Sequence, residues 1–218
     1  MHRTLLLAAA FAALSLSPAA AQLRGASPTA QAPQPVMLMG PARTQALAFA
    51  NRSLNAMQSL QGRFVQTSPG GQFSGAFYLQ RPGKLRFEYD PPATMLIVSD
   101  GRVVSVRDRA LRTTQRTPLR STPLNFILRS DIDLDRDANI TRVVRQGSAL
   151  FVTARDRTGQ ANGEITMRLD LPEARLSSWE VIDATGARTN IALTEVSEPA
   201  SLDRRLFRMD DIVEPRGH

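Results

Sequence analysis

Few residues in this sequence could carry covalent or metal chemistry. The 218-residue chain contains no cysteine, and its two histidines are His2 and His218, at its two ends. Without cysteine there can be no disulfide, no thiolate metal site and no cysteine nucleophile. The terminal histidines also argue against a Ser-His-Asp triad or a histidine metal site. Any catalysis would therefore rest on carboxylates or hydroxyl groups, and we expect neither a metal nor another cofactor.

The acidic run from Asp131 to Asp137 invites a calcium interpretation, because it places carboxylates at alternate positions as an EF-hand loop does. Two loop positions do not fit this motif. Arg136 occupies the sixth position, where glycine makes the sharp turn, and Arg142 occupies the twelfth, where a glutamate ligand is needed. We expect a solvated connection here and assign no metal.

Arg81 is a candidate binding residue because of its position on a predicted strand. The apolar face of that strand carries Phe73, Phe77 and Leu79, and the alternation continues to Arg81. A guanidinium at the rim of an apolar concavity needs acceptors, and its five donors suit the carbonyl oxygens of a facing helix or loop. The alternative is that the turn breaks the alternation, so that Arg81 lies in solvent or pairs with Glu88. Spacing alone slightly favours that alternative.

The charge balance is basic, with 27 Lys and Arg against 20 Asp and Glu, a formal net charge of +7. Lys84 is the only lysine, and the arginines are scattered among acids. The one Trp is isolated, so no aromatic-studded basic strand indicates a nucleic-acid partner. Weak attraction to anionic lipid headgroups is the more reasonable consequence of this charge.

The N-terminus predicts export. Arg3 gives a positive start, Leu5–Leu16 is an apolar run, and Pro18–Ala21 ends in small residues before Gln22. The run is shorter than the roughly 20 residues that span a bilayer. We therefore predict a signal peptide over residues 1–21, a flexible lead-in rich in Ala, Pro, Gln and Ser over residues 22–41, and a single folded domain over residues 42–218.

The segment from Ala42 to Gln61 predicts an amphipathic helix. It contains neither Gly nor Pro, and its apolar residues recur at steps of three and four. Pro41 stands where a helix can begin, and Gly62 stands where a left-handed cap usually ends one.

After Gly62 the apolar period falls to two, and short alternating runs are separated by turn signals such as Pro82-Gly83. Their close spacing predicts one large antiparallel meander. Leu111–Arg116 is a further candidate strand. The predicted strands are Arg63–Thr67, Gln72–Arg81, Lys84–Tyr89, Thr94–Ser99, Arg102–Asp108, Ile140–Arg145, Ser148–Ala154, Gly163–Leu171, Arg175–Asp183, Arg188–Val196 and Leu206–Met209.

One interruption of this series predicts a second, short helix. Thr122-Pro123 supplies a hydroxyl N-cap and a proline at the first helical position, before the apolar turn Leu124–Leu128. A long sheet with one helix before it and one inserted packs best when the sheet curls and the helices lie against its concave face. The predicted fold class is α+β.

Five segments, taken in chain order, carry a family resemblance. They are Phe64-Val65-Gln66, Ser74–Pro92, Ile97–Gly101, Thr122-Pro123-Leu124 and Asp183–Gly186. The Arg-Pro-Gly stretch in the second segment and the Asp-Gly hairpin in the third are the more specific motifs. From about Ala42 to Met209 the chain resembles the periplasmic outer-membrane lipoprotein carriers of the LolA family.

The resemblance implies an unclosed antiparallel barrel, or half-barrel, whose apolar cavity is lidded by helices. It implies a non-enzymatic carrier in the periplasm that takes triacylated lipoproteins from an inner-membrane Lol ABC transporter to an outer-membrane acceptor, itself a lipoprotein. We expect this carrier to act as a monomer, without nucleic acid. The resemblance further implies that Arg81 hydrogen-bonds to the lid in the empty closed form and is displaced by acyl chains, which would make Arg81 the residue that gates the lid.

Nine apolar residues are candidates for the wall of the acyl-chain cavity. For each of them ordinary core packing is the commoner fate of an inward-facing apolar residue. The nine are Leu54, Met57, Phe73, Phe77, Leu79, Leu85, Phe87, Phe126 and Ile127.

Two departures from the family pattern bear on these expectations. Val104 stands where many relatives have Trp, which affects the shape of the cavity. The C-terminal strand pattern is reduced to Leu206–Met209, which affects handover to an acceptor.

Two other functions are weighed against the carrier. A related periplasmic lipid-binding or envelope-stress sensor could use the same half-barrel, because fold does not fix function. A carboxylate-based envelope hydrolase could use a pair such as Glu88 and Asp90, although no spacing singles out that pair.

Overall fold

The computed structural model describes residues 32–159, 161 and 163–209. The predicted signal peptide and residues 22–31 lie outside the described residues, as do residues 210–218. Within the described range no helix is long and apolar enough to cross a membrane.

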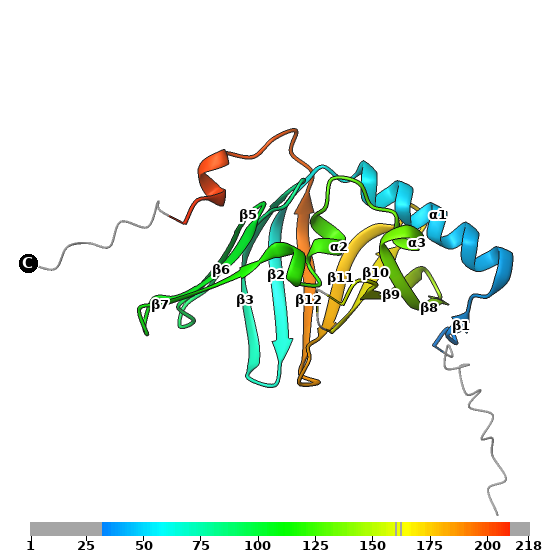
Figure 1. Ribbon diagram of the computed structural model, residues 1–218, viewed down its shortest axis with the longest axis horizontal. Helices are drawn as coiled ribbons and strands as arrows, with labels where there is room; N and C mark the ends of the chain where they lie inside the picture. Colours follow the sequence, from blue (N-terminus) through cyan, green and yellow to red (C-terminus); the bar gives the residue numbers. More distant parts are fainter. Residues whose placement is uncertain (1–31, 160, 162, 210–218) are drawn as a thin grey trace, which may run out of the picture. The chain divides into compact units, whose positions relative to one another are not determined.

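Twelve strands form a single sheet in which every neighbouring pair is antiparallel. The order across the sheet is β1-β8-β9-β10-β11-β12-β2-β3-β4-β5-β6-β7, so β1 and β7 are its two free ends (Figure 1). The strands are β1 (Val36–Met37), β2 (Ser59–Ser68), β3 (Gly71–Gln80), β4 (Lys84–Tyr89), β5 (Met95–Asp100), β6 (Val103–Asp108), β7 (Thr113–Pro118), β8 (Ala138–Gln146), β9 (Ala149–Asp156), β10 (Glu164–Asp170), β11 (Arg175–Ile182) and β12 (Arg188–Ser197).

Three helices lie against the concave face of the curved sheet (Figure 1). They are α1 (Gly40–Ala56), α2 (Asn125–Leu128) and α3 (Leu134–Asp137). Two short 3-10 turns, η1 (Leu119–Ser121) and η2 (Arg204–Phe207), complete the elements of the described residues. The α+β prediction of an unclosed, curved antiparallel sheet with covering helices is confirmed.

The core fills the space between the concave face and these helices. From α1 it receives Leu47 and Leu54, and from α2 it receives Ile127, all nearly inaccessible to solvent. Aromatic rings meet on the sheet side, where Phe64 lies edge-on to Phe87 with ring centroids 4.6 Å apart. Edge-to-face packing of this kind adds to the stability gained from burial alone.

The predicted helix over residues 42–61 runs too far. The helix ends at Ala56, Met57 is extended, and β2 begins at Ser59. Gly62 caps no helix. It lies inside β2, where a Cβ atom would stand 2.7 Å from the carbonyl oxygen of Thr194. The glycine is therefore required by the close approach of β12, and the periodicity of three and four continued past the true end of the helix by coincidence.

Most predicted strands occur within about two residues of their expected bounds, but two segments differ in kind. The predicted strand Leu206–Met209 is wrong, because Asp203 accepts a hydrogen bond from the backbone N–H of Arg205 and starts the 3-10 turn η2. The acidic connection contains the short helix α3, because the Asp133 side chain caps it by accepting from the backbone N–H of Arg136 at 3.1 Å.

The two ends of the sheet also differ from expectation. The lead-in was predicted to be flexible to residue 41, yet Val36–Met37 pairs with β8 and the Leu38 N–H donates to the Val143 carbonyl at 2.8 Å. At the other end the candidate strand Leu111–Arg116 is present as β7, shifted two residues along the chain. The shift follows from the turn, which uses residues 109–112.

Candidate functional site

The structure brings the nine candidate cavity residues into one apolar cluster. Eight of them are buried members of the core, and Phe73 packs against it with part of its surface exposed. They come from α1 and the residue that follows it, from β3, β4 and α2, so the cluster lies between the helices and the concave face. Most of it is closed and filled by side chains in this conformation.

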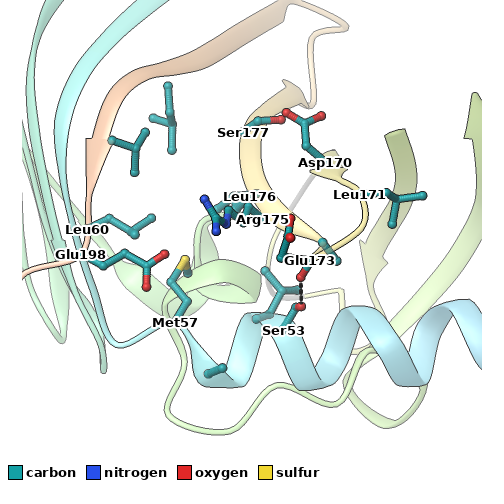
Figure 2. A pocket seen from close by; sticks show the side chains of 15 residues that line it. Ser53, Met57, Leu60, Asp170, Leu171, Glu173, Arg175, Leu176, Ser177 and Glu198 are labelled. Atoms are coloured by element: carbon teal, nitrogen blue, oxygen red, sulfur yellow. Dashed lines mark hydrogen bonds between the residues drawn. The ribbon is translucent and has the colours of Figure 1, made fainter. Parts of the chain in front are cut away.

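An open cavity of about 620 Å³ lies beside this cluster, at the last turns of α1. Figure 2 shows Met57, the residue after α1, facing Leu60 of β2 and Leu176 of β11. Of the nine candidates, Leu54 and Met57 line this cavity. The volume falls in the range of roughly 300–1,000 Å³ that small-ligand pockets occupy. The cavity therefore gives access from solvent to the sheet-facing side of the lid.

Charged side chains stand at the rim of the same cavity. Asp170, Glu173 and Glu198 contribute carboxylates and Arg175 one guanidinium (Figure 2). The floor is apolar, with Leu193 and Ala174 among its residues. An apolar floor under a polar rim suits a ligand that has an apolar body and a polar end that stays in contact with water.

Arg81 ties the two covering segments together from below. It follows β3 directly and is 6% exposed. Its Nη1 donates to the carbonyl oxygens of Leu54 and of Met57, the latter at 3.2 Å, at the end of α1. Its Nε and Nη2 donate to the Arg129 carbonyl at 2.9 and 2.7 Å, and Nη2 also donates to Ser130 at 3.1 Å. The alternative of an Arg81–Glu88 pair does not occur, since these acceptors are carbonyl oxygens of both covering segments.

The turn between β3 and β4 holds Arg81 in this position. The Arg81 N–H donates to the Gln58 carbonyl at 2.8 Å, and the Gly83 N–H donates to the Leu128 carbonyl at 2.7 Å. Gly83 has a φ of +76°, and a Cβ there would lie 2.5 Å from the Cα of Gly101. This close approach of two turns explains why the motif needs glycine after Arg81-Pro82.

Asn55 and Asn51 join α1 to the segment after α2, and sequence reasoning missed both. The Asn55 amide accepts from the Ile132 N–H at 2.9 Å and donates to the Ile132 carbonyl at 2.8 Å. Its Oδ1 also accepts from Arg81 at 3.1 Å. One turn earlier, Asn51 Oδ1 accepts from the Leu134 N–H at 3.0 Å. Their spacing of four residues on a helix was the available signal, because it places both side chains on one face.

The opposite side of α1 is held by a contact at the cavity. The Ser53 hydroxyl donates to the carbonyl oxygen of Glu173 in the turn between β10 and β11 (Figure 2). The last turn of α1 is therefore fixed on one side by Arg81 and on the other by the β10–β11 turn. A movement of this turn would break both sets of hydrogen bonds together.

The electrostatics of Arg81 differ from those of an ordinary ion pair. Burial lowers its pKa below the usual value, and the nearby charge of Asp131 opposes that shift. None of its hydrogen bonds in the described structure goes to a carboxylate. Hydrogen bonds to neutral carbonyl oxygens recover only part of the free energy that a charge loses on leaving water. Arg81 therefore makes many hydrogen bonds to the covering segments, but their net contribution to stability is moderate.

The acidic run supports the covering segment from outside. Asp137 pairs with Arg129 at 2.6 Å between Oδ2 and Nη1, and with Arg136 at 2.8 Å between Oδ1 and Nε. Hydrogen bonds from Arg136, and then from Arg129, lower the pKa of Asp137 to about 2. This network fixes Arg129, whose carbonyl oxygen is one of the acceptors of Arg81.

The carboxylates considered for hydrolysis have other partners. Glu88 accepts from Arg86 at 2.7 Å, and Asp90 accepts from the Ser74 hydroxyl at 2.7 Å and from Arg63. The Ser74 and Arg63 hydrogen bonds lower the pKa of Asp90. A general acid needs a raised pKa, so the environment of Asp90 does not favour that role.

Together these features define a class of protein: an unclosed half-barrel whose apolar interior is covered by helices that a buried arginine holds in place. The model of the family described as outer membrane lipoprotein carrier protein LolA matches residues 55–210. The chain therefore belongs to the LolA family.

Relatives from several bacteria are similar over most of their length. An outer-membrane lipoprotein carrier protein from Chromobacterium violaceum is 27% identical over 178 residues, covering 78% of this chain and 85% of the relative. One from Pseudomonas aeruginosa is 28% identical over 166 residues, covering 72% and 79%. Among solved structures, a LolA superfamily protein from Nitrosomonas europaea is 11% identical with a TM-score of 0.46, covering 77% of this chain and 97% of that one.

Proposed function

We propose that this chain is a periplasmic carrier that binds the acyl chains of triacylated lipoproteins released from the inner membrane and delivers them to the outer membrane. The observation that carries the proposal is the set of Arg81 hydrogen bonds to two covering segments above an apolar core. The family and the relatives' names support the same function. In this proposal residues 1–21 are the signal peptide and the remainder is the exported carrier.

Acyl chains would bind by replacing side-chain contacts under the lid. Each methylene moved from water into an apolar site contributes about 0.8 kcal/mol, so even partly enclosed chains are held firmly. Entry would begin at the open cavity, past Leu54 and Met57, and continue between the helices and the sheet. The other seven candidate residues would contact the chains after the lid has moved.

Release is the harder step for such a carrier, and Arg81 promotes release by stabilising the empty state. Its hydrogen bonds exist only in the closed, empty state, so they add free energy to that state and oppose retention of cargo. A ligand shifts such an equilibrium only by its differential affinity for the two states. Binding of the acyl chains therefore requires the closed-state hydrogen bonds to break, which lowers the net affinity for cargo. An acceptor with a better apolar site can then take the chains.

Within this proposal the partners are an inner-membrane ABC transporter that loads the carrier and an outer-membrane lipoprotein that receives the cargo. Neither chemistry nor cofactor is needed, because every step is transfer of apolar surface. The proposed carrier acts as a single chain.

The test is to isolate the chain gently after co-expression with a triacylated lipoprotein and to identify bound material by mass spectrometry. The intact lipoprotein is expected. A protein that is empty, and that also extracts no lipoprotein from inner-membrane vesicles, would overturn the carrier function.

The role of Arg81 is tested separately with Arg81→Leu. This variant should still capture cargo, but its delivery to an acceptor should fall roughly 30-fold or more if the closed state loses about 2–3 kcal/mol relative to the loaded state. Arg86→Leu is the matched control, because Arg86 is also buried but lies on the opposite face of the sheet. Unimpaired delivery by Arg81→Leu would remove Arg81 from the mechanism.

A further inference from the structure

The hairpin of β6 and β7 combines positive charge with one exposed apolar side chain. All residues from Arg109 to Pro118 are exposed, and Leu111 at the turn exposes 71% of its surface. The stretch from Arg107 to Arg120 contains five arginines and one acid, Asp108, so four of the seven net charges of the chain lie in it. β7 is the last strand of the sheet, at the opposite end from β1 and β8 (Figure 1).

The turn presents Leu111 in a fixed position. Asp108 Oδ1 accepts from the backbone N–H groups of Ala110 and Leu111 at 2.9 and 3.1 Å. It also accepts from the Thr94 hydroxyl at 2.8 Å, and the Arg109 N–H donates to the Thr94 carbonyl at 3.1 Å. Asp108, the one acid, is therefore hydrogen-bonded to the backbone of the turn and to Thr94, just before β5. Little conformational entropy would be lost if the turn met a partner surface.

The arginines of the turn take part in no ion pair within the part of the chain that the structure describes. No ion pair to the side chain of Arg109, Arg112 or Arg116 occurs among the described residues. Leu111 does not belong to the apolar core or to the residues packed against it. An exposed leucine between two arginines without an ion pair at a protruding turn suits a partner that offers apolar contact and negative charge within a few ångströms.

A phospholipid bilayer with anionic headgroups has this arrangement at its surface. Arginine binds lipid phosphates well because its planar donors match phosphate oxygens, and an apolar side chain lowers its free energy by entering the boundary of the acyl region. A protein partner fits less well, because a single convex leucine offers too little apolar area for a stable interface.

We propose that the turn from Arg109 to Arg112 docks this chain on the surface of anionic phospholipid bilayers. Leu111 enters the headgroup region, and Arg109 and Arg112 contact lipid phosphates. This property is independent of the carrier function, because it needs neither the lid nor cargo.

The test is co-sedimentation of the purified chain, residues 22–218, with vesicles of phosphatidylcholine alone or of phosphatidylcholine with phosphatidylglycerol. Binding to the anionic vesicles is expected, and it should weaken with added salt. Arg109→Ser with Arg112→Ser should lower affinity by roughly 30-fold, at about fivefold per arginine. Leu111→Ser should lower it by roughly tenfold.

Matched controls separate a docking site from diffuse attraction. Arg142→Ser with Arg145→Ser removes the same charge from exposed positions on β8, and Met39→Ser removes an apolar side chain that is also 71% exposed. Each control should change affinity by less than about twofold. Equal losses in controls and turn variants would overturn the proposal, as would equal binding to neutral and anionic vesicles.

Insertion can be observed directly because the chain has no cysteine of its own. Leu111→Cys carrying an environment-sensitive fluorophore should shift to the blue on anionic vesicles, and Met39→Cys with the same label should not. A bound protein whose label at position 111 does not shift would contradict insertion of this turn. Variants that keep full vesicle binding but lose contact with another protein would reassign the turn to a protein partner and overturn the membrane proposal.

Discussion

Two arginines are buried on opposite faces of the sheet, Arg81 just after β3 and Arg86 within β4, and each is hydrogen-bonded to a segment that covers its face. Arg81 binds the lid on the concave face through carbonyl oxygens of α1 and of residues 129–130. Arg86 binds the Leu206 carbonyl of η2 on the convex face at 2.9 Å and pairs with Glu88 on its own strand.

The difference lies in where the compensating charge is placed. The carboxylate partner of Arg86 belongs to β4, so its charge stays compensated whether or not η2 is in place. Arg81 has only acceptors that leave with the cover. If the covering segments moved away, the Arg81 guanidinium would be left to water, where it is well solvated, and their return would restore the carbonyl contacts. Under the proposed function, this placement of charge would allow the concave cover to move reversibly more readily than the convex cover.

The largest expected effect comes from two separate substitutions, in which each of the two arginines is replaced by leucine. Arg81→Leu leaves the carbonyl oxygens of Leu54, Met57 and Arg129 without a donor, so the free energy of unfolding should fall by about 2–3 kcal/mol. In Arg86→Leu the free energy of unfolding should fall by about 1 kcal/mol. Denaturant unfolding measures both, and a larger loss in Arg86→Leu would reverse the comparison.

A smaller effect is expected from Asn55→Ala, which removes the link between α1 and Ile132. The free energy of unfolding should fall by about 1–2 kcal/mol, because two backbone groups lose their partner. Hydrogen exchange of the Ile132 amide should accelerate, while the amides of η2 stay unchanged. Asn51→Ala is the control at the neighbouring position, where the Leu134 amide should respond instead. Equal acceleration at both amides in both variants would show that the lid opens as one unit.

The smallest effect concerns acid. The pKa of Asp137 is lowered to about 2 in the folded chain, so its ion pairs stabilise the fold above the ordinary aspartate value near 4 and are lost as the pH falls toward 2. The loss should be about 1 kcal/mol after allowance for solvent screening. Between pH 5 and pH 2 the free energy of unfolding should depend less on pH in Asp137→Asn than in the unchanged protein. Identical pH profiles for both chains would contradict the role of Asp137 in fixing Arg129.

The sequence predicted the sheet well because alternation in a half-buried strand is a strong local signal. Lys84–Tyr89 was found with its expected bounds. For Arg81 the alternation allowed the concave side, but spacing alone slightly favoured solvent or a pair with Glu88, and the family resemblance was needed to predict its contacts with the covering segments. The end of α1 was predicted poorly, since the proximity of β12 at Gly62 depends on residues more than 130 positions away. Asn55 was missed although its spacing from Asn51 was a signal, because its partners, the Ile132 backbone and the Arg81 guanidinium, are brought to it by the fold.

An unclosed sheet has two free edges, and these also affect how copies of the chain meet. Exposed backbone donors and acceptors at a sheet edge can pair with another chain and lead to aggregation. Here β7 is polar throughout, carries Arg116 and ends in Pro118, while β1 is only two residues long and covers one end of β8. The edges are therefore poor templates for strand addition. Under the proposed function, the unclosed sheet would leave room for the covering helices to move, and these short or polar edges would oppose pairing with a second copy of the chain.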